Sequence, residues 1–297
     1  MGQIPYSFEA NSCPSGGLPT RRSTLIISHK HKYLFVELPQ TGTSAISEEL
    51  CKYYDGMRIL KKHATYQDFL NAIPEGKDYF VFSCIRNPLD KIVSTFLKIK
   101  TNHKGKYDNP IYWSRNGGFI SDRRIKAFNL LKGTDFGFSI YFKKFYIFPY
   151  DDMSCLSHKQ FDFIIRFENI QHDFSELLEL LGLQQIRQLP VVNRTSEKEK
   201  DYLSYYTPDM YKRVVRIFGP YMQKWDYDFP ATWGRHSIPW YSRFLFETLC
   251  IVRRHFRWSS AAYAQVLNNI WSKFLYWFLS WGIYERATQH NTKHDRC

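Results

Sequence analysis

A glycine-containing turn that follows an apolar run is the first segment of the sequence with a capacity for chemistry. The run covers residues 33–38, and the turn consists of Pro39, Gln40, Thr41, Gly42, Thr43 and Ser44. Glycine lets several backbone N–H groups point at one anion, and the N-terminus of a following helix adds partial positive charge. The turn therefore favours an anion such as phosphate, although a plain helix-capping turn needs the same residue types. It is not a Walker A loop, because the pattern G-x-x-x-x-G-K-[ST] is absent.

A second anion site is indicated by an arginine and a serine that are eight residues apart. Arg86 follows the apolar run 78–85, and Pro88 is typical of the first turn of a helix that would carry Ser94 nearly two turns in. The guanidinium and the hydroxyl can then hold one phosphate together. Because nucleotides bind at the carboxyl ends of neighbouring parallel strands, the two sites predict a single nucleotide held between them.

The elements that must position these residues follow an α/β pattern from about residue 24 to residue 232. The alternation of strand-like and helix-like segments predicts a parallel sheet flanked by helices. Strands are expected at 33–38, 78–85 and 161–167. Helices are expected at 43–54, from Thr65, from Pro88, up to Gly182, and from Thr207-Pro208 to Gly219-Pro220. The stretch 101–118 is expected to be a mobile surface loop.

Composition narrows the class of protein. The chain has 297 residues, a net charge of +13, 44% hydrophobic and 18% aromatic residues, which excludes a disordered chain. Six cysteines without a C-x-x-C pair argue against a zinc ribbon or a disulfide framework, and favour a reducing compartment. No secretory signal and no spanning apolar run are visible, so we expect a cytoplasmic location, with membrane association as an open addition. The charge indicates an anionic partner of some kind.

The chain is expected to have three parts. Residues 1–23 read as a flexible N-terminal arm, 24–234 as the α/β domain, and 235–297 as a basic, aromatic, helical extension with a net charge of +6. Two interpretations of the extension stay open. It packs on the domain as a helical tail, or residues 235–284 lie on an anionic membrane surface.

The two motifs together resemble those of the PAPS-dependent sulfotransferases, where PAPS is 3′-phosphoadenosine 5′-phosphosulfate. The likeness is greatest to the carbohydrate type related to heparan sulfate 2-O-sulfotransferase, and it covers about residues 30–230. Residues 189–195 and Trp225-Asp226-Tyr227 also resemble elements of this family. The resemblance implies a P-loop-like parallel sheet and transfer of a sulfuryl group from PAPS to a hydroxyl of a carbohydrate or glycan. It also implies that residues 39–44 hold the phosphosulfate, while Arg86 and Ser94 hold the 3′-phosphate.

One residue departs from the family pattern. Gln40 stands where the family has a lysine that contacts the oxygen bridging phosphate and sulfate. A neutral amide gives a weaker hydrogen bond than a cation, and loss of one preorganised donor commonly costs about 10²–10³ in rate. Lys61 or Lys62 is the candidate replacement cation. A PAPS- or nucleotide-binding module with impaired catalysis is therefore a second hypothesis.

The general base is expected to be a histidine that follows the first motif. His63 occupies the stretch where the family has its base, and an ordinary histidine titrates near neutrality. Glu37, at the end of the first predicted strand, is the rival candidate. Glu168 either faces the acceptor or pairs with Arg166, and the ion pair is the favoured interpretation.

Cations and aromatic residues in the stretch 101–118 suit a sugar or an acidic glycan as acceptor, although a surface loop explains them equally well. They are His103, Lys104, Lys106, Tyr107, Tyr112, Trp113 and Arg115. No metal is expected, because His29 and His31 form only a dyad. A basic nucleic-acid binder is the third hypothesis and the least favoured, since the sequence carries no RRM, KH or helix-turn-helix signature.

Overall fold

A computed structural model describes residues 25–59, 66–151, 161–190 and 201–255. The predictions for the N-terminal arm, for Lys61, Lys62 and His63, for residues 191–195 and for most of the extension lie outside these ranges. The chain divides into two compact units, residues 1–250 and 251–297, and the architecture below is that of the first. The expected boundary at residue 234 stays a prediction.

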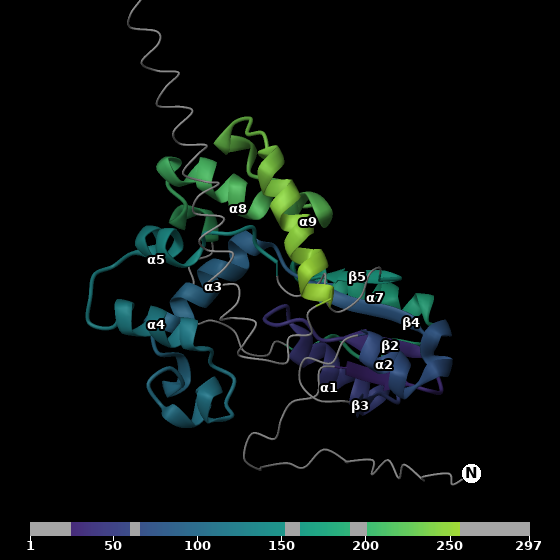
Figure 1. Cartoon of the computed structure of the whole chain (residues 1–297). Coiled ribbons are helices and arrows are strands. Elements are labelled where there is room, and N and C mark those ends of the chain that lie inside the picture. The colour runs from purple at the N-terminus through teal and green to yellow at the C-terminus, as the bar shows by residue number, and fades with distance from the viewer. Residues whose placement is uncertain (1–24, 60–65, 152–160, 191–200, 256–297) are drawn as a thin grey trace, which may run out of the picture. The chain divides into compact units, whose positions relative to one another are not determined.

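A five-stranded, mostly parallel sheet forms the centre of this unit, in the order β3-β1-β2-β4-β5 (Figure 1). Strand β2 pairs in parallel with β4, and β4 with β5, whereas β1 runs antiparallel to both β2 and β3. The strands are β1 (Leu25–Ser28), β2 (Tyr33–Val36), β3 (Met57–Ile59), β4 (Phe80–Ile85) and β5 (Phe163–Arg166). The three predicted strands are confirmed. The expectation of a wholly parallel sheet is wrong at β1, because only residues 29–32 join it to β2, too few for a crossover.

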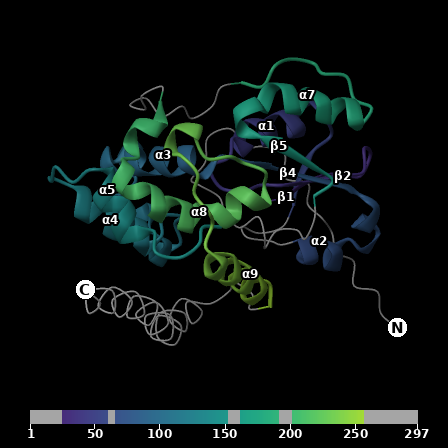
Figure 2. The ribbon, with the colours of Figure 1, turned by 90° about the horizontal axis from the view of Figure 1, so that it is seen from above.

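Helices cover both faces of the sheet, as Figure 2 shows for α1 and α7 on one side and α2 on the other. Successive strand residues alternate between two apolar clusters, as a pleated strand requires. Ile26, Phe35 and Phe82 pack against α1 (Thr43–Tyr53) and α7 (Ile170–Leu180). Leu25, Leu34, Val36, Val81 and Ile85 pack with Phe69 of α2 (Tyr66–Ala72).

A third apolar cluster joins the helices that lie beyond the sheet. It includes α3 (Pro88–Lys100), α4 (Asp122–Leu131), α5 (Phe138–Phe145) and α8 (Tyr211–Lys224). Short 3₁₀ turns complete the fold at Pro74–Asp78, His103–Gly105, Pro110–Tyr112, Ser114–Asn116, Phe167–Asn169, Tyr202–Tyr205, Pro208–Met210 and Ala231–Trp233. Tyr107 belongs to the same core and is 5% exposed. The expectation of a surface loop at 101–118 is therefore wrong in part, because its aromatic side chains pack on the helices.

Helix α8 extends past the predicted stop at Gly219-Pro220 and ends at Lys224. Pro220 has no N–H for the carbonyl of Arg216, and the Ser242 hydroxyl from α9 (Trp240–His255) donates to that oxygen instead. A Cβ atom at Gly219 would lie 2.7 Å from Ile238, so the glycine allows close packing there. Gly-Pro therefore marks a packing site within the helix. Among the described helices, none is long and apolar enough to cross a membrane.

Candidate functional site

The candidate site lies where three parallel strands end. Val36 of β2 pairs with Ser83 of β4, and Ile85 of β4 pairs with Arg166 of β5. Because these strands run in the same direction, the segments that follow them meet at one edge of the sheet. These segments are residues 37–42, 86–87 and 167–169. Both predicted anion motifs are therefore at this edge.

The first motif has a backbone shaped for exposing N–H groups. Gln40 and Gly42 have left-handed φ angles of 63° and 84°. A Cβ atom on Gly42 would lie 2.8 Å from Ile170 and 2.9 Å from Phe167, so only glycine fits. Gly42 also caps α1 without a side-chain hydrogen bond. The N–H groups of residues 42–44 have no acceptor within the described ranges, which leaves them available at the helix N-terminus.

The hydroxyl and thiol groups of the first motif stabilise its shape. Thr41 and Thr43 both donate to the carbonyl of Leu38, at 3.0 and 3.2 Å. The fully buried thiol of Cys84 donates to the carbonyl of Thr41 at 2.6 Å, and burial is the main reason why its pKa is raised. Two of the three hydroxyls that we expected to face an anion therefore hold the turn together. The Ser44 hydroxyl has no partner among the described residues.

The second motif is a buried network around Arg86, which is 8% exposed. Nη2 donates to the Ser94 hydroxyl at 2.9 Å, so the structure brings the predicted pair together. Nε and Nη2 also lie 2.8 and 2.7 Å from Oδ2 of Asp90. The guanidinium stacks on Phe167, 4.1 Å from the ring centre. Asp90 was not singled out in the sequence, although its spacing of four residues from Arg86 was a usable signal.

Two contacts join the motifs directly. Nη1 of Arg86 donates to the carbonyl of Gln40 at 3.4 Å, and the Thr95 hydroxyl donates to Oε1 of Gln40 at 2.8 Å. The amide N–H groups of Gln40 have no partner in the part of the chain that the structure describes. Gln40 can therefore donate a hydrogen bond while Thr95 holds its oxygen. No sequence pattern pointed to Thr95.

Neither acidic candidate is a free base in the structure. Glu37 accepts from the Ser47 hydroxyl and lies 3.5 Å from Arg58. Glu168 accepts from the N–H of Asn87 at 2.7 Å and from the Tyr227 hydroxyl at 2.9 Å. These contacts leave the rival general base and the acceptor-facing carboxylate engaged with other groups.

The predicted ion pair of Glu168 with Arg166 is wrong, because Arg166 lies 3.9 Å from Asp226 instead. The pKa of Tyr227 is raised by burial first and then by the negative charge of Glu168. Burial also raises the pKa of Tyr202, with Asp90 and Glu168 as further causes. Both tyrosines therefore lie close to the carboxylates of the site.

The predicted acceptor residues are only partly accessible. Tyr107 is buried, and its carbonyl accepts from Nε1 of Trp113 at 3.0 Å. Arg115 stacks on Trp113 at 4.2 Å, and Lys106 lies 5.5 Å from the ring centre of Phe119. Tyr107 is thus a core residue, while the cations stay at the surface.

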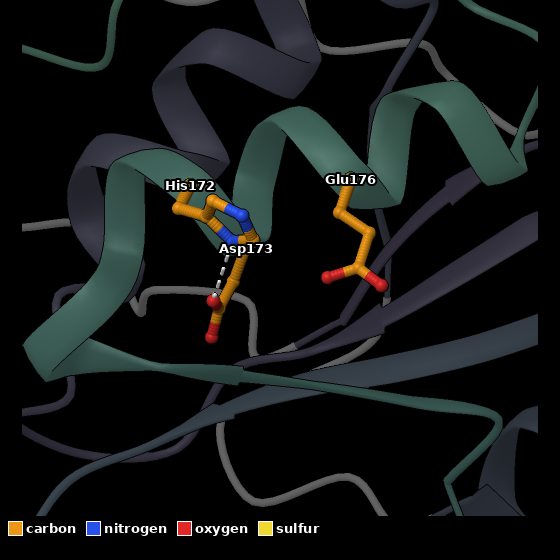
Figure 3. A group of neighbouring side chains, drawn as sticks. All are labelled: His172, Asp173 and Glu176. Carbon is orange, nitrogen blue, oxygen red and sulfur yellow. Dashed lines mark ion pairs between the residues drawn. The ribbon is translucent and has the colours of Figure 1, made fainter.

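One group of potential metal ligands is present within the described residues, on α7 (Figure 3). It consists of His172, Asp173 and Glu176. His172 Nδ1 lies 3.4 Å from Asp173, and the other oxygen of Asp173 accepts from the N–H of Arg166 at 2.7 Å. The imidazole is 82% exposed. These interactions account for Asp173 without an ion.

The fold and the site thus define a class of α/β protein with two anion-binding motifs at one sheet edge. A family model described as "Sulfotransferase family" matches residues 23–228. The chain therefore belongs to the sulfotransferase family, and is a transferase. No curated protein and no solved structure matches it significantly.

Proposed function

We propose that the protein transfers a sulfuryl group from PAPS to a hydroxyl of a carbohydrate or glycan. The family match supports sulfuryl transfer in general, and the choice of PAPS and of a carbohydrate acceptor rests on the resemblance to the heparan sulfate 2-O type. The contact between the two motifs carries the proposal. Arg86 reaches the Gln40 carbonyl with one nitrogen and Ser94 with another, as one nucleotide held by both motifs requires.

The reaction is an in-line displacement at sulfur. The acceptor oxygen forms a bond to sulfur while the bond from sulfur to the bridging phosphate oxygen breaks, and the adenosine bisphosphate (PAP) leaves with the electron pair. The acceptor proton passes to a base, for which His63 remains the candidate, with Lys61 or Lys62 as the additional cation. Positioning and electrostatic stabilisation supply most of the catalysis in such transfers.

Each part of the site has an assigned role in this proposal. The N–H groups of residues 42–44, with Pro39 and Thr41 shaping the turn, bind the phosphosulfate. The amide of Gln40 donates to the bridging oxygen, and Arg86 with Ser94 binds the 3′-phosphate. No residue of the site is assigned to a metal.

Binding of PAP without transfer is the second candidate function. Gln40 favours it, because its amide brings no charge to stabilise the leaving group. Contact of residues 235–284 with an anionic membrane surface also stays a prediction, since residues 256–284 lie outside the described ranges.

Calorimetry with PAP tests the donor site. We expect Ser94→Ala to weaken PAP binding about tenfold, the effect of one hydrogen bond to a charged group. Binding of AMP, which lacks the 3′-phosphate, should not change. Arg115→Ala is the control, because Arg115 is exposed and stacks only on Trp113. A wild-type protein that does not bind PAP would refute the proposal.

Transfer of labelled sulfate from PAPS to a panel of glycans then separates the two candidate functions. Labelled product from any glycan supports the enzyme. Tight PAP binding with no product from any acceptor supports the binding module.

A further inference from the structure

Positive charge is concentrated in one segment of the chain. Residues 98–150 contain eleven lysines and arginines against three aspartates, a net charge of +8 out of +13. This segment begins in the last turn of α3 and includes α4 and α5. It therefore starts beside the candidate donor site, since α3 also carries Ser94.

Lys98 lies at the centre of this charge. It follows Ser94 by four residues, so the two side chains lie on the same face of α3. Lys98 is half-buried and has no acidic partner among the described residues. Burial lowers its pKa, and the positive charges of Arg86, Arg124 and the two lysines of the next turn lower it further.

The surrounding side chains carry the same sign of charge. Burial lowers the pKa of His103 as well, and Lys98, Lys104 and Lys106 lower it further. The group that these interactions define is termed the Lys98 cluster, and it consists of Arg86, Lys98, His103, Lys104, Lys106 and Arg124. Like charges held together at partly buried positions cost free energy, which a bound anion would offset.

The fold holds this cluster in place. Both α4, which carries Arg124, and the turn at His103–Gly105 pack against α3 (Figure 1). The side chain of Asn102 accepts from the N–H of Tyr107 at 2.9 Å, which fixes the turn between them. The cations are therefore brought together by the packing of the protein rather than by a flexible chain.

Arg86 alone is poorly suited to neutralise a phosphate. Its guanidinium has five N–H groups, and four of them are directed at Asp90, Ser94 and the Gln40 carbonyl. Asp90 also offsets its charge. The half-buried cation on the same face as Ser94 is Lys98.

We propose that the Lys98 cluster is a second anion site, which extends the donor site along α3 and binds a phosphate or sulfate group. Its position beside Arg86 gives it this role within the proposed function, on which it rests. The group belongs either to the donor, as its 3′-phosphate, or to an anionic acceptor.

Calorimetry with two nucleotides tests the donor as the source. Lys98→Met is expected to weaken PAP binding about tenfold to hundredfold and to leave AMP binding unchanged. Lys100→Met is the matched control, because Lys100 is on the same helix, is exposed, and lies 5.8 Å from the Phe96 ring centre. Equal thermal unfolding of the variants, and a second variant Lys98→Gln, exclude a loss of folding.

Dextran sulfate oligomers, with unsulfated dextran as the neutral counterpart, test the acceptor as the source. If Lys98→Met weakens only dextran sulfate binding, the site accepts the anionic group of an acceptor. If Lys98→Met matches Lys100→Met with PAP and with dextran sulfate, the inference is wrong. A wild-type protein that binds neither nucleotide but loses dextran sulfate binding with Lys98→Met would sink the proposed donor and retain the anion site.

Discussion

The buried ion pair between Arg86 and Asp90 gives the sharpest prediction about the site. Only 10% and 7% of the two side chains are exposed, and the closest nitrogen and oxygen are 2.7 Å apart. Arg86→Met would leave a carboxylate buried without its cation. Removal of one partner of such a pair costs about 3–5 kcal/mol in free energy of unfolding.

Removing both charges together should cost far less. Uncharged residues of similar size often replace a buried pair without loss, so we expect Arg86→Met/Asp90→Leu to lie within about 1 kcal/mol of the wild type. The four proteins form a double-mutant cycle with a coupling of about 3 kcal/mol. Urea unfolding followed by circular dichroism at pH 7 measures it.

An exposed ion pair serves as the control for this cycle. Lys143 and Asp209 are 2.9 Å apart, but 48% and 60% of their side chains are exposed. Their coupling should stay below about 1 kcal/mol and shrink as salt is added. If the losses at Arg86 and Asp90 simply add, or if both pairs show the same coupling, the claim that burial sets the strength of the first pair is refuted.

Three further predictions concern other parts of the site. Gly42→Ala should lower stability by more than 1 kcal/mol and weaken PAP binding, whereas Gly117→Ala, with a similar φ of 83° but open space around it, should show only about 1 kcal/mol of backbone strain in urea unfolding; equal losses would contradict the steric argument. Gln40→Lys should raise kcat about 10-fold or more if transfer is limited by the missing charge, and an unchanged kcat would rule that out. The lowered pKa of His103 means that the unfolded chain takes up its proton first, so stability should fall as pH drops from about 7 to 5. His103→Gln should reduce that loss in thermal unfolding, and an unchanged pH profile would contradict it.

The parts of the fold that the sequence predicted are those with an uninterrupted apolar signal. β2, β4 and β5 each begin or lie in runs that a turn residue closes. β3 has only three residues, of which Met57 is 41% exposed, so no apolar run marks it. The antiparallel β1 depends on a short hairpin that only pairing with β2 reveals.

The positions of the two motifs were predictable because each follows a strand, but their internal partners were not. The spacing of Arg86 and Ser94 on a strand end and a helix gave their proximity. Thr95 contacts Gln40 across 55 residues of sequence, and no local pattern encodes that distance. Glu168 was assigned to Arg166 because the two alternate on one side of a strand, whereas the chain leaves the strand at Phe167 in a 3₁₀ turn. This turn directs the carboxylate to Asn87.

The hydrogen bonds within the site determine which groups can drive donor binding. The side chains of Arg86, Thr41 and Thr43 already have partners, so a ligand that uses them gains only the difference between the new and the old bonds. The backbone N–H groups of residues 42–44 have no such partner among the described residues. Most of the favourable free energy should therefore come from this turn and the N-terminus of α1, and Arg86 should contribute mainly to discrimination of the 3′-phosphate. This explains why Gly42, which keeps the N–H groups exposed, is more critical for affinity than the arginine that first marks the site in the sequence.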